Sequence, residues 1–131
     1  MSRFLMPLVV KKHSEPKSLF GRANWQIVAS FPYQSSLAGD IITVPCGFIT
    51  DFGSVPRFFM MFALFGDVGH EAATVHDYLC RRKMLARSVA DKIYREALIE
   101  MGVPAWRWRA MYVGVRVGAV LAWLKCRLTL V

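Results

Sequence analysis

Apolar residues in the first fifty positions come in short runs bounded by turn-forming residues. Glycine, proline, serine and aspartate separate these runs, as they commonly do between antiparallel strands. The runs that we interpret as strands are 5–10, 24–33 and 41–48. Residues 1–50 are therefore predicted to form a small antiparallel sheet of three strands.

The apolar positions change to helical spacing in the second half of the chain. Ser54 followed by Pro56 is a common entry into a helix, whose apolar body would be 58–65. Three further helices are predicted at about 69–82, 88–101 and 106–127. The fold class is thus α+β, with a sheet region at 1–50 and a helical region at 54–127 in one domain, 1–131.

Two of these helices have recognisable ends and are close enough to form a hairpin. Asp67 can cap the helix at 69–82, and Ser88 with Asp91 has capping-box character for the next one. Gly102 and Pro104 end that second helix. A link of a few residues favours an antiparallel pair of helices whose turn lies near residues 83 and 84.

Composition narrows the class of protein without naming a function. The 131 residues are 55% hydrophobic and 20% charged, with a net charge of +8 that suits either nucleic acid or anionic lipid. Cys46, Cys80 and Cys126 lie far apart and form no CxxC pair, which argues against a disulfide framework or a structural zinc site. An apolar N-terminal stretch ends at Lys11 without a cleavage site, so we expect no signal peptide.

The most concentrated chemical signal is His76-Asp77, two ionisable residues inside an otherwise apolar helix. Burying such groups is costly unless they are paired or face a cleft. His76 and Asp91 mirror each other across the expected turn, so their side chains should meet. A carboxylate on one imidazole nitrogen strengthens the other nitrogen as a base, which predicts catalytic roles for His76 and Asp91.

Asp77 points about 100° away from His76 on the same helix and needs a different partner. A divalent cation, calcium or magnesium, is one candidate, with Asp51 of the loop at 45–56 as a second ligand. The alternative for Asp51 is an Asx-turn or a cap on local backbone amides. Residues expected to support the site are Thr50, Ser54, Tyr78 and Tyr94.

Structural roles compete with the catalytic one. Asp91 can complete a helix cap or pair with Arg95 one turn later, and a buried histidine is commonly a hydrogen-bonded core residue. Solvent access separates these alternatives, because a catalytic His76 must open onto a pocket.

Three motifs follow one another along the chain. They are Val44-Pro45-x-Gly47-Phe48-x-Thr50-Asp51-x-x-Ser54-Val55-Pro56, Ala73-x-x-His76-Asp77-Tyr78-Leu79 and Ala90-Asp91-x-Ile93. On these motifs the chain resembles a family of small proteins of tailed phages and prophages, known as domain of unknown function 1353, over roughly residues 24–118. It departs at Gly53, where alanine is common in the family, and at Cys80, where tyrosine is common. The resemblance implies a phage or prophage origin, with the host cytoplasm or the virion as location, and no particular activity.

A looser resemblance links the His-Asp pair to calcium-dependent phospholipases. In those enzymes one helix carries the pair and an antiparallel helix carries an aspartate. This resemblance implies His76 as base, Asp77 as calcium ligand and Asp91 as orienter. The glycine-rich calcium loop and the disulfides of those enzymes are missing here, so the loop around Gly47 and Gly53 would have to replace them.

The last predicted helix is basic and rich in tryptophan. Residues 104–131 hold five basic residues and no acidic one. Trp106, Arg107, Trp108 and Arg109 are predicted to contact a partner or an anionic membrane surface. The apolar stretch 110–124 contains Arg116 and is shorter than the roughly 20 residues of a span, so a transmembrane helix is disfavoured. The alternative is a core helix packed on the sheet with its arginines in solvent.

Two functions follow from these patterns. The first is a small phage hydrolase that uses His76 and Asp91, with a cation at Asp77 and Asp51. The second is a non-catalytic virion, tail-assembly or host-interaction protein in which these residues form a structural polar network. Nucleic-acid binding is disfavoured because the basic residues are spread along the chain and no known module is present.

Overall fold

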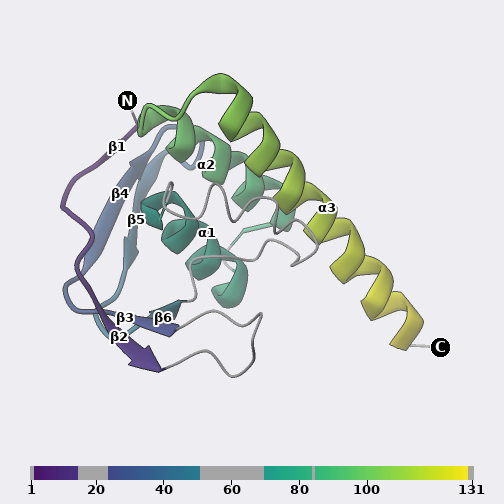
Figure 1. Ribbon diagram of the computed structural model, residues 1–131, viewed down its shortest axis with the longest axis horizontal. Coiled ribbons are helices and arrows are strands. Elements are labelled where there is room, and N and C mark those ends of the chain that lie inside the picture. Colours follow the sequence, from purple (N-terminus) through teal and green to yellow (C-terminus); the bar gives the residue numbers. More distant parts are fainter. Residues whose placement is uncertain (1, 15–23, 51–69, 84, 130–131) are drawn as a thin grey trace.

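The computed structural model describes residues 2–14, 24–50, 70–83 and 85–129, and Figure 1 shows their arrangement. Within these residues, two small antiparallel sheets precede three helices. One sheet has the strand order β1-β4-β5 and the other the order β2-β3-β6. The strands are β1 (Arg3–Phe4), β2 (Val10–Ser14), β3 (Asn24–Ile27), β4 (Phe31–Ser35), β5 (Asp40–Val44) and β6 (Ile49–Thr50). The helices are α1 (His70–Arg82), α2 (Arg87–Glu100) and α3 (Ala105–Thr129).

The α+β class is confirmed, but the single three-stranded sheet that we predicted is wrong. The predicted strand at 5–10 falls almost entirely between β1 and β2, the one at 24–33 is divided between β3 and β4, and the one at 41–48 covers most of β5 and the turn after it. At each of these places the chain passes from one sheet to the other. Pro7, which has no N–H to donate, lies in the first crossing, and Pro45 with Gly47 at φ +93° forms the turn that ends β5. The apolar pattern runs through these crossings, which is why it suggested three long strands.

The β4–β5 hairpin supplies the sheet face on which the helices pack. Tyr33 lies opposite Ile42 and Phe31 opposite Val44, and all four side chains are buried. Gly39, at φ +67°, closes the turn by donating its N–H to the carbonyl of Ser35. The period-two burial expected for a strand is therefore present in both strands: buried residues alternate with partly buried ones in β4 and with exposed ones in the second half of β5.

The helices form the predicted antiparallel hairpin and one outer layer. In Figure 1, α1 and α2 lie side by side against the sheets, α1 touching β5 and β6 and α2 touching β4, while α3 lies along α2. Thus α3 does not pack on the sheet, the alternative that the sequence left open. All three helices begin and end within two residues of the predicted positions. The expected helix at 58–65 and the Asp67 cap lie outside the described residues.

The capping-box prediction for α2 is wrong. The helix begins at Arg87, its N-cap position is Ala86, and no side chain caps it. Ser88 is exposed inside the first turn, whereas Asp91 is buried on the side facing α1. The Asp91 carboxylate does not cap the backbone N–H groups at the start of α2. Its oxygens bind side chains instead, as described below.

Glu96 fixes α2 to the β4–β5 hairpin. Its Oε1 accepts hydrogen bonds from the Tyr33 hydroxyl at 2.7 Å and the Ser35 hydroxyl at 2.8 Å. Its Oε2 accepts the backbone N–H of Leu37 at 2.9 Å. Burial, followed by the hydrogen bond to Glu96, raises the pKa of Tyr33 above its ordinary value, so the phenol remains a donor. One carboxylate thus satisfies two buried hydroxyl groups at the junction of sheet and helix.

Replacing Glu96 with alanine should therefore destabilise the fold. Leaving the two buried hydroxyls without their acceptor should cost about 2 kcal/mol, or roughly 8 °C in melting temperature. Thermal unfolding followed by circular dichroism measures this. Glu100→Ala, an exposed change on the same helix, is the control and should shift the melting temperature little; equal shifts for both variants would contradict the anchoring role.

Candidate functional site

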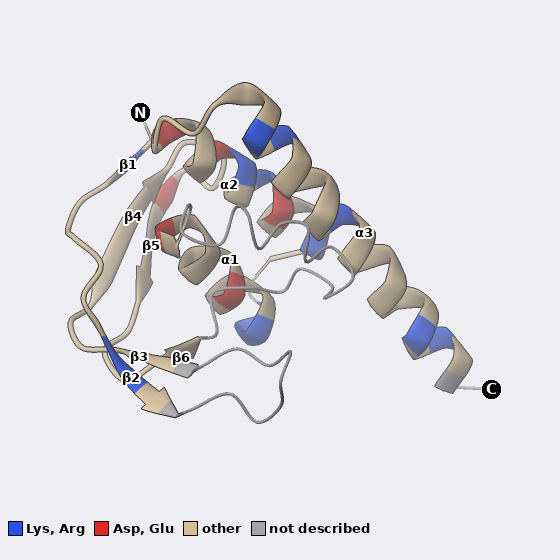
Figure 2. Cartoon of the chain, in the orientation of Figure 1, with Lys and Arg blue, Asp and Glu red and all other residues tan. Residues whose placement is uncertain are grey.

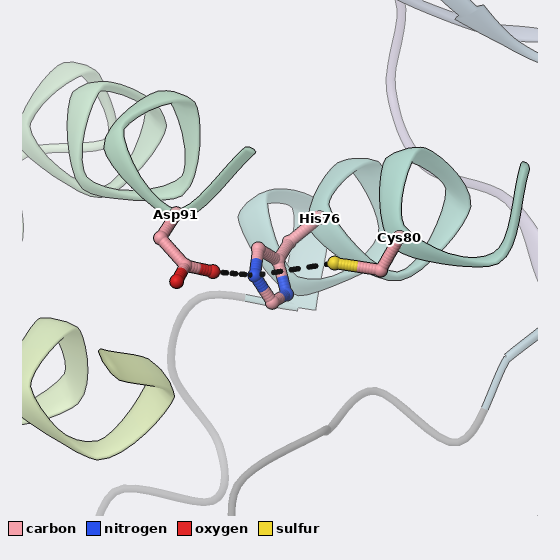
Figure 3. Close-up of side chains that lie close together, drawn as sticks. All are labelled: His76, Cys80 and Asp91. Carbon is pink, nitrogen blue, oxygen red and sulfur yellow. Dashed lines mark hydrogen bonds and ion pairs between the residues drawn. The ribbon is translucent and has the colours of Figure 1, made fainter. Parts of the chain in front are cut away.

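Asp91 is the centre of a buried polar cluster that joins all three helices. Its Oδ1 lies 2.6 Å from Nε2 of His76 on α1 and 3.0 Å from Nε of Arg87, one turn earlier on α2. Its Oδ2 accepts a hydrogen bond from Nη1 of Arg116 on α3 at 2.8 Å. Asp91 is 0% exposed and His76 is 2% exposed. The predicted meeting of His76 and Asp91 is confirmed, and Figure 3 shows the two side chains pointing at each other.

The protonation of this pair follows from the charges around it. Burial alone would raise the pKa of Asp91, but the hydrogen bond to His76 and the charges of His76 and Arg87 lower it overall. Asp91 is therefore a carboxylate at neutral pH, and a carboxylate only accepts hydrogen bonds. Nε2 of His76 must carry the hydrogen that points at Oδ1. In the neutral ring the lone pair then lies on Nδ1, which has no hydrogen-bond partner among the described residues.

Cys80 lies one turn after His76 and was not among the predicted site residues. Its Sγ is 3.6 Å from Nε2 of His76, and Figure 3 shows it on the same side of α1. The spacing of four residues from His76 would have been enough to find it. Burial, with smaller effects of Asp91 and Asp77, raises the pKa of the Cys80 thiol to about 11. Cys80 is thus a neutral thiol beside the ring, without the thiolate character of a nucleophile.

The histidine, cysteine and aspartate together have the composition of a transition-metal site. One ligand atom from each of His76, Cys80 and Asp91 lies within 4.8 Å of the others. The surroundings oppose a cation there, because Arg87 and Arg116 already occupy both carboxylate oxygens with positive charge. The Nε2 proton, needed for the bond to Asp91, would also have to leave. The cluster is better described as a histidine oriented by a carboxylate.

Asp77 points away from His76, as predicted, and binds an arginine. Its Oδ1 accepts a hydrogen bond from Nε of Arg81 at 2.9 Å, and Nη1 of Arg81 donates to the carbonyl of Ile49 at 3.0 Å. The same guanidinium lies 5.7 Å from the ring centre of Phe48. Asp77 and Arg81 therefore connect α1 to β6. Asp51, the expected second metal ligand, and Ser54 lie outside the described residues.

Among the remaining supporting residues, Tyr94 lies beside His76. The two rings are 5.0 Å apart, centre to centre. Tyr78 instead packs edge-on against Phe48 at 5.4 Å, and Thr50 is buried in β6. The Tyr94 ring restricts the tilt of the imidazole, so the orientation of His76 is set by packing as well as by Asp91.

Two arginines of the cluster were missed by the sequence analysis, and one expected pair is wrong. Arg95 does not pair with Asp91; its guanidinium lies 4.8 Å from the ring centre of Tyr112 on α3. The partner one turn away is Arg87, on the N-terminal side. Arg116 was detectable as the one charged residue in the apolar stretch 110–124, a position where a buried partner should be expected.

The predicted contact patch at the start of α3 is only partly available to a partner. Trp106 is exposed, but Trp108 packs partly against the core. The guanidinium groups of Arg107 and Arg109 lie over Trp106 and Trp108. Within the described part of the chain, no helix is long and apolar enough to cross a membrane.

The raised pKa of Cys80 predicts slow alkylation. At pH 8 only a very small fraction of Cys80 is thiolate, which is the reactive form. Cys80 should therefore react with iodoacetamide more than about 100-fold slower than an ordinary exposed cysteine. Mass spectrometry of labelled peptides measures this, with the exposed Cys46 and Cys126 as internal controls. If Cys80 were labelled as fast as Cys46 and Cys126, its thiol would be activated, and Cys80 would become a candidate nucleophile.

Comparison with known proteins places the chain in a family without assigning a reaction. No curated protein matches it, and no solved structure matches it. Residues 25–115 match a family described as protein of unknown function (DUF1353). The matched segment includes His76, Asp77, Cys80 and Asp91. Since it covers more than half of the sequence, the chain belongs to the DUF1353 family.

Proposed function

We propose that this protein is a small hydrolase in which His76 acts as general base and Asp91 orients it. The observation that carries the proposal is the 2.6 Å contact between Nε2 of His76 and Oδ1 of Asp91. This contact fixes one tautomer and presents Nδ1 as the basic nitrogen. It is the arrangement in which a histidine activates water.

The surrounding charges support each step of this reaction. Nδ1 would accept a proton from a water molecule whose oxygen attacks an ester carbonyl, and would later return that proton to the leaving alcohol. The imidazolium formed between these steps is stabilised by the Asp91 carboxylate. Arg87 and Arg116 keep Asp91 ionised throughout, so the carboxylate does not take the proton from Nε2.

A cation at Asp77 and Asp51 remains a separate prediction. Calcium or magnesium at Asp77 would compete with the guanidinium of Arg81, which binds Oδ1.

The DUF1353 resemblance supports a phage or prophage origin, and with it the host cytoplasm or the virion as the place of action. Lipid and peptidoglycan are the substrates that we would test first.

A second candidate function is favoured by burial. His76 and Asp91 are almost completely shielded from solvent, as expected for a network that holds three helices together. In that case the protein is a non-catalytic virion, tail-assembly or host-interaction component. Its binding surface would then lie elsewhere on the molecule.

Substituting His76 with asparagine separates the two functions. In the hydrolase, His76→Asn should lower activity by about 10² or more with little change in melting temperature, because the base is lost and some hydrogen bonding is kept. In the structural protein it should cost about 1 to 3 kcal/mol, or several degrees. The assays are thermal melts and an activity screen over lipid, peptidoglycan and ester substrates.

The exposed His13→Asn is the matched control and should leave both readouts unchanged. A wild-type protein without activity, combined with a strongly destabilised His76→Asn variant, would defeat the hydrolase proposal.

The cation prediction is tested by thermal melts in calcium and in magnesium. If either ion binds at Asp77, millimolar concentrations should raise the melting temperature by mass action, and Asp77→Asn should abolish the rise. Arg81→Gln removes the competing guanidinium and should strengthen the effect. A melting temperature unchanged by either ion in the wild type and in Arg81→Gln would leave Asp77 as the partner of Arg81 alone.

A further inference from the structure

Helix α3 carries apolar side chains on two opposite sides. The inner side packs against α2 and buries Met111 and Val115. At 100° per residue, a second set falls within one arc about 100° wide on the far side of the helix. We call this set the outer stripe; its members are Val113, Val117, Val120, Leu121, Leu124 and Leu128. Burial against α2 accounts for only one of the two apolar sides.

The outer stripe is exposed over most of its length. Val113, Val120, Leu121 and Leu124 are each between 42% and 55% exposed, and Leu128 is 76% exposed. A shallow hollow of about 320 Å³ opens on the stripe between Val113 and Leu121, beside Arg116. The end of α3 extends beyond the rest of the described structure (Figure 1). Contiguous apolar surface of this kind marks an interaction site in a folded protein.

The basic charge of α3 indicates that the partner of the outer stripe is anionic. Residues 101–131 contain Arg107, Arg109, Arg116, Lys125 and Arg127 and no acidic residue. Figure 2 shows the charged bands of α3 as basic only. The helical positions of Lys125 and Arg127 place them on the two borders of the outer stripe, where long side chains can extend toward phosphate while the stripe is buried.

Trp123 adds a residue typical of the membrane interface. It is exposed and adjoins Arg127, whose guanidinium carbon lies 4.8 Å from the centre of the Trp123 ring. Tryptophan and arginine are both favoured at the level of lipid headgroups. A second copy of the chain fits less well, because it would bring the same basic residues to an interface that has no acidic partner for them.

We propose that the outer stripe, with Trp123, Lys125 and Arg127, is a peripheral binding surface for membranes that contain anionic lipid. The helix lies in the headgroup region with the stripe toward the acyl chains and the two basic side chains at phosphate. This surface is independent of His76 and Asp91. It also moves the predicted membrane contact from Trp106 and Trp108 to the distal half of α3.

Sedimentation of the full-length protein with vesicles tests this surface. Vesicles of phosphatidylcholine with about one quarter phosphatidylglycerol should bind the protein at least about tenfold more strongly than pure phosphatidylcholine, and added salt should weaken the binding. Trp123 fluorescence should shift to the blue on binding, and Trp123→Phe should remove most of the shift.

Two double variants separate the apolar and the charged contributions. Leu124→Gln with Leu128→Gln, and separately Lys125→Gln with Arg127→Gln, should each weaken binding about tenfold or more. The matched control is Ala122→Gln, an exposed change on the side of α3 away from the stripe, which should leave binding unchanged. All these positions are exposed, so circular dichroism should show the same fold for every variant.

Three results would overturn the proposal. One is no binding to anionic vesicles at low salt. Another is binding that Leu124→Gln with Leu128→Gln does not weaken. The third is a dimer in sedimentation equilibrium that this same double variant dissociates, because the outer stripe would then be covered by a second copy of the chain.

Discussion

Asp91 is a charge placed where water cannot reach it, and the arrangement of the helices follows from how that charge is compensated. A buried carboxylate without partners would cost several kcal/mol. Here one helix supplies the carboxylate, and each of the other two supplies a donor, His76 from α1 and Arg116 from α3. Moving any one helix would break a charged contact. The hydrophobic core favours close packing of these helices, and Asp91 specifies which rotation of each helix is allowed.

The same charge links stability and the proposed chemistry. Because the pKa of Asp91 is lowered in the folded protein, its contribution to stability is present at neutral pH and is lost as the pH falls through the folded pKa. The ionised carboxylate also sets the tautomer of His76. The contacts that hold the three helices together are the same contacts that orient the imidazole of His76. The structural role and the catalytic role of this network are therefore compatible.

The parts of the molecule that depend on local periodicity could be predicted from the sequence, and those that depend on the path of the chain could not. Helical spacing placed the ends of α1, α2 and α3 within two residues, and the mirror positions across the turn near Lys83 were enough to pair His76 with Asp91. Arg116 lies 25 residues from Asp91, and its contact depends on the direction in which α3 crosses α2. The division of the strands between two sheets was hidden because the apolar runs that predicted the strands continue through the crossings.

These crossings have a consequence for how the chain folds. The chain passes between the sheets after β1, after β3 and after β5, so each sheet contains strands from both ends of the N-terminal region. Neither sheet can be completed from one continuous segment: β1 must find β4, and β3 must find β6. The hairpin of α1 and α2 is local by comparison and closes a short loop, which is fast. The two sheets are therefore expected to form late and together, as one cooperative unit, on a helical hairpin that is already in place.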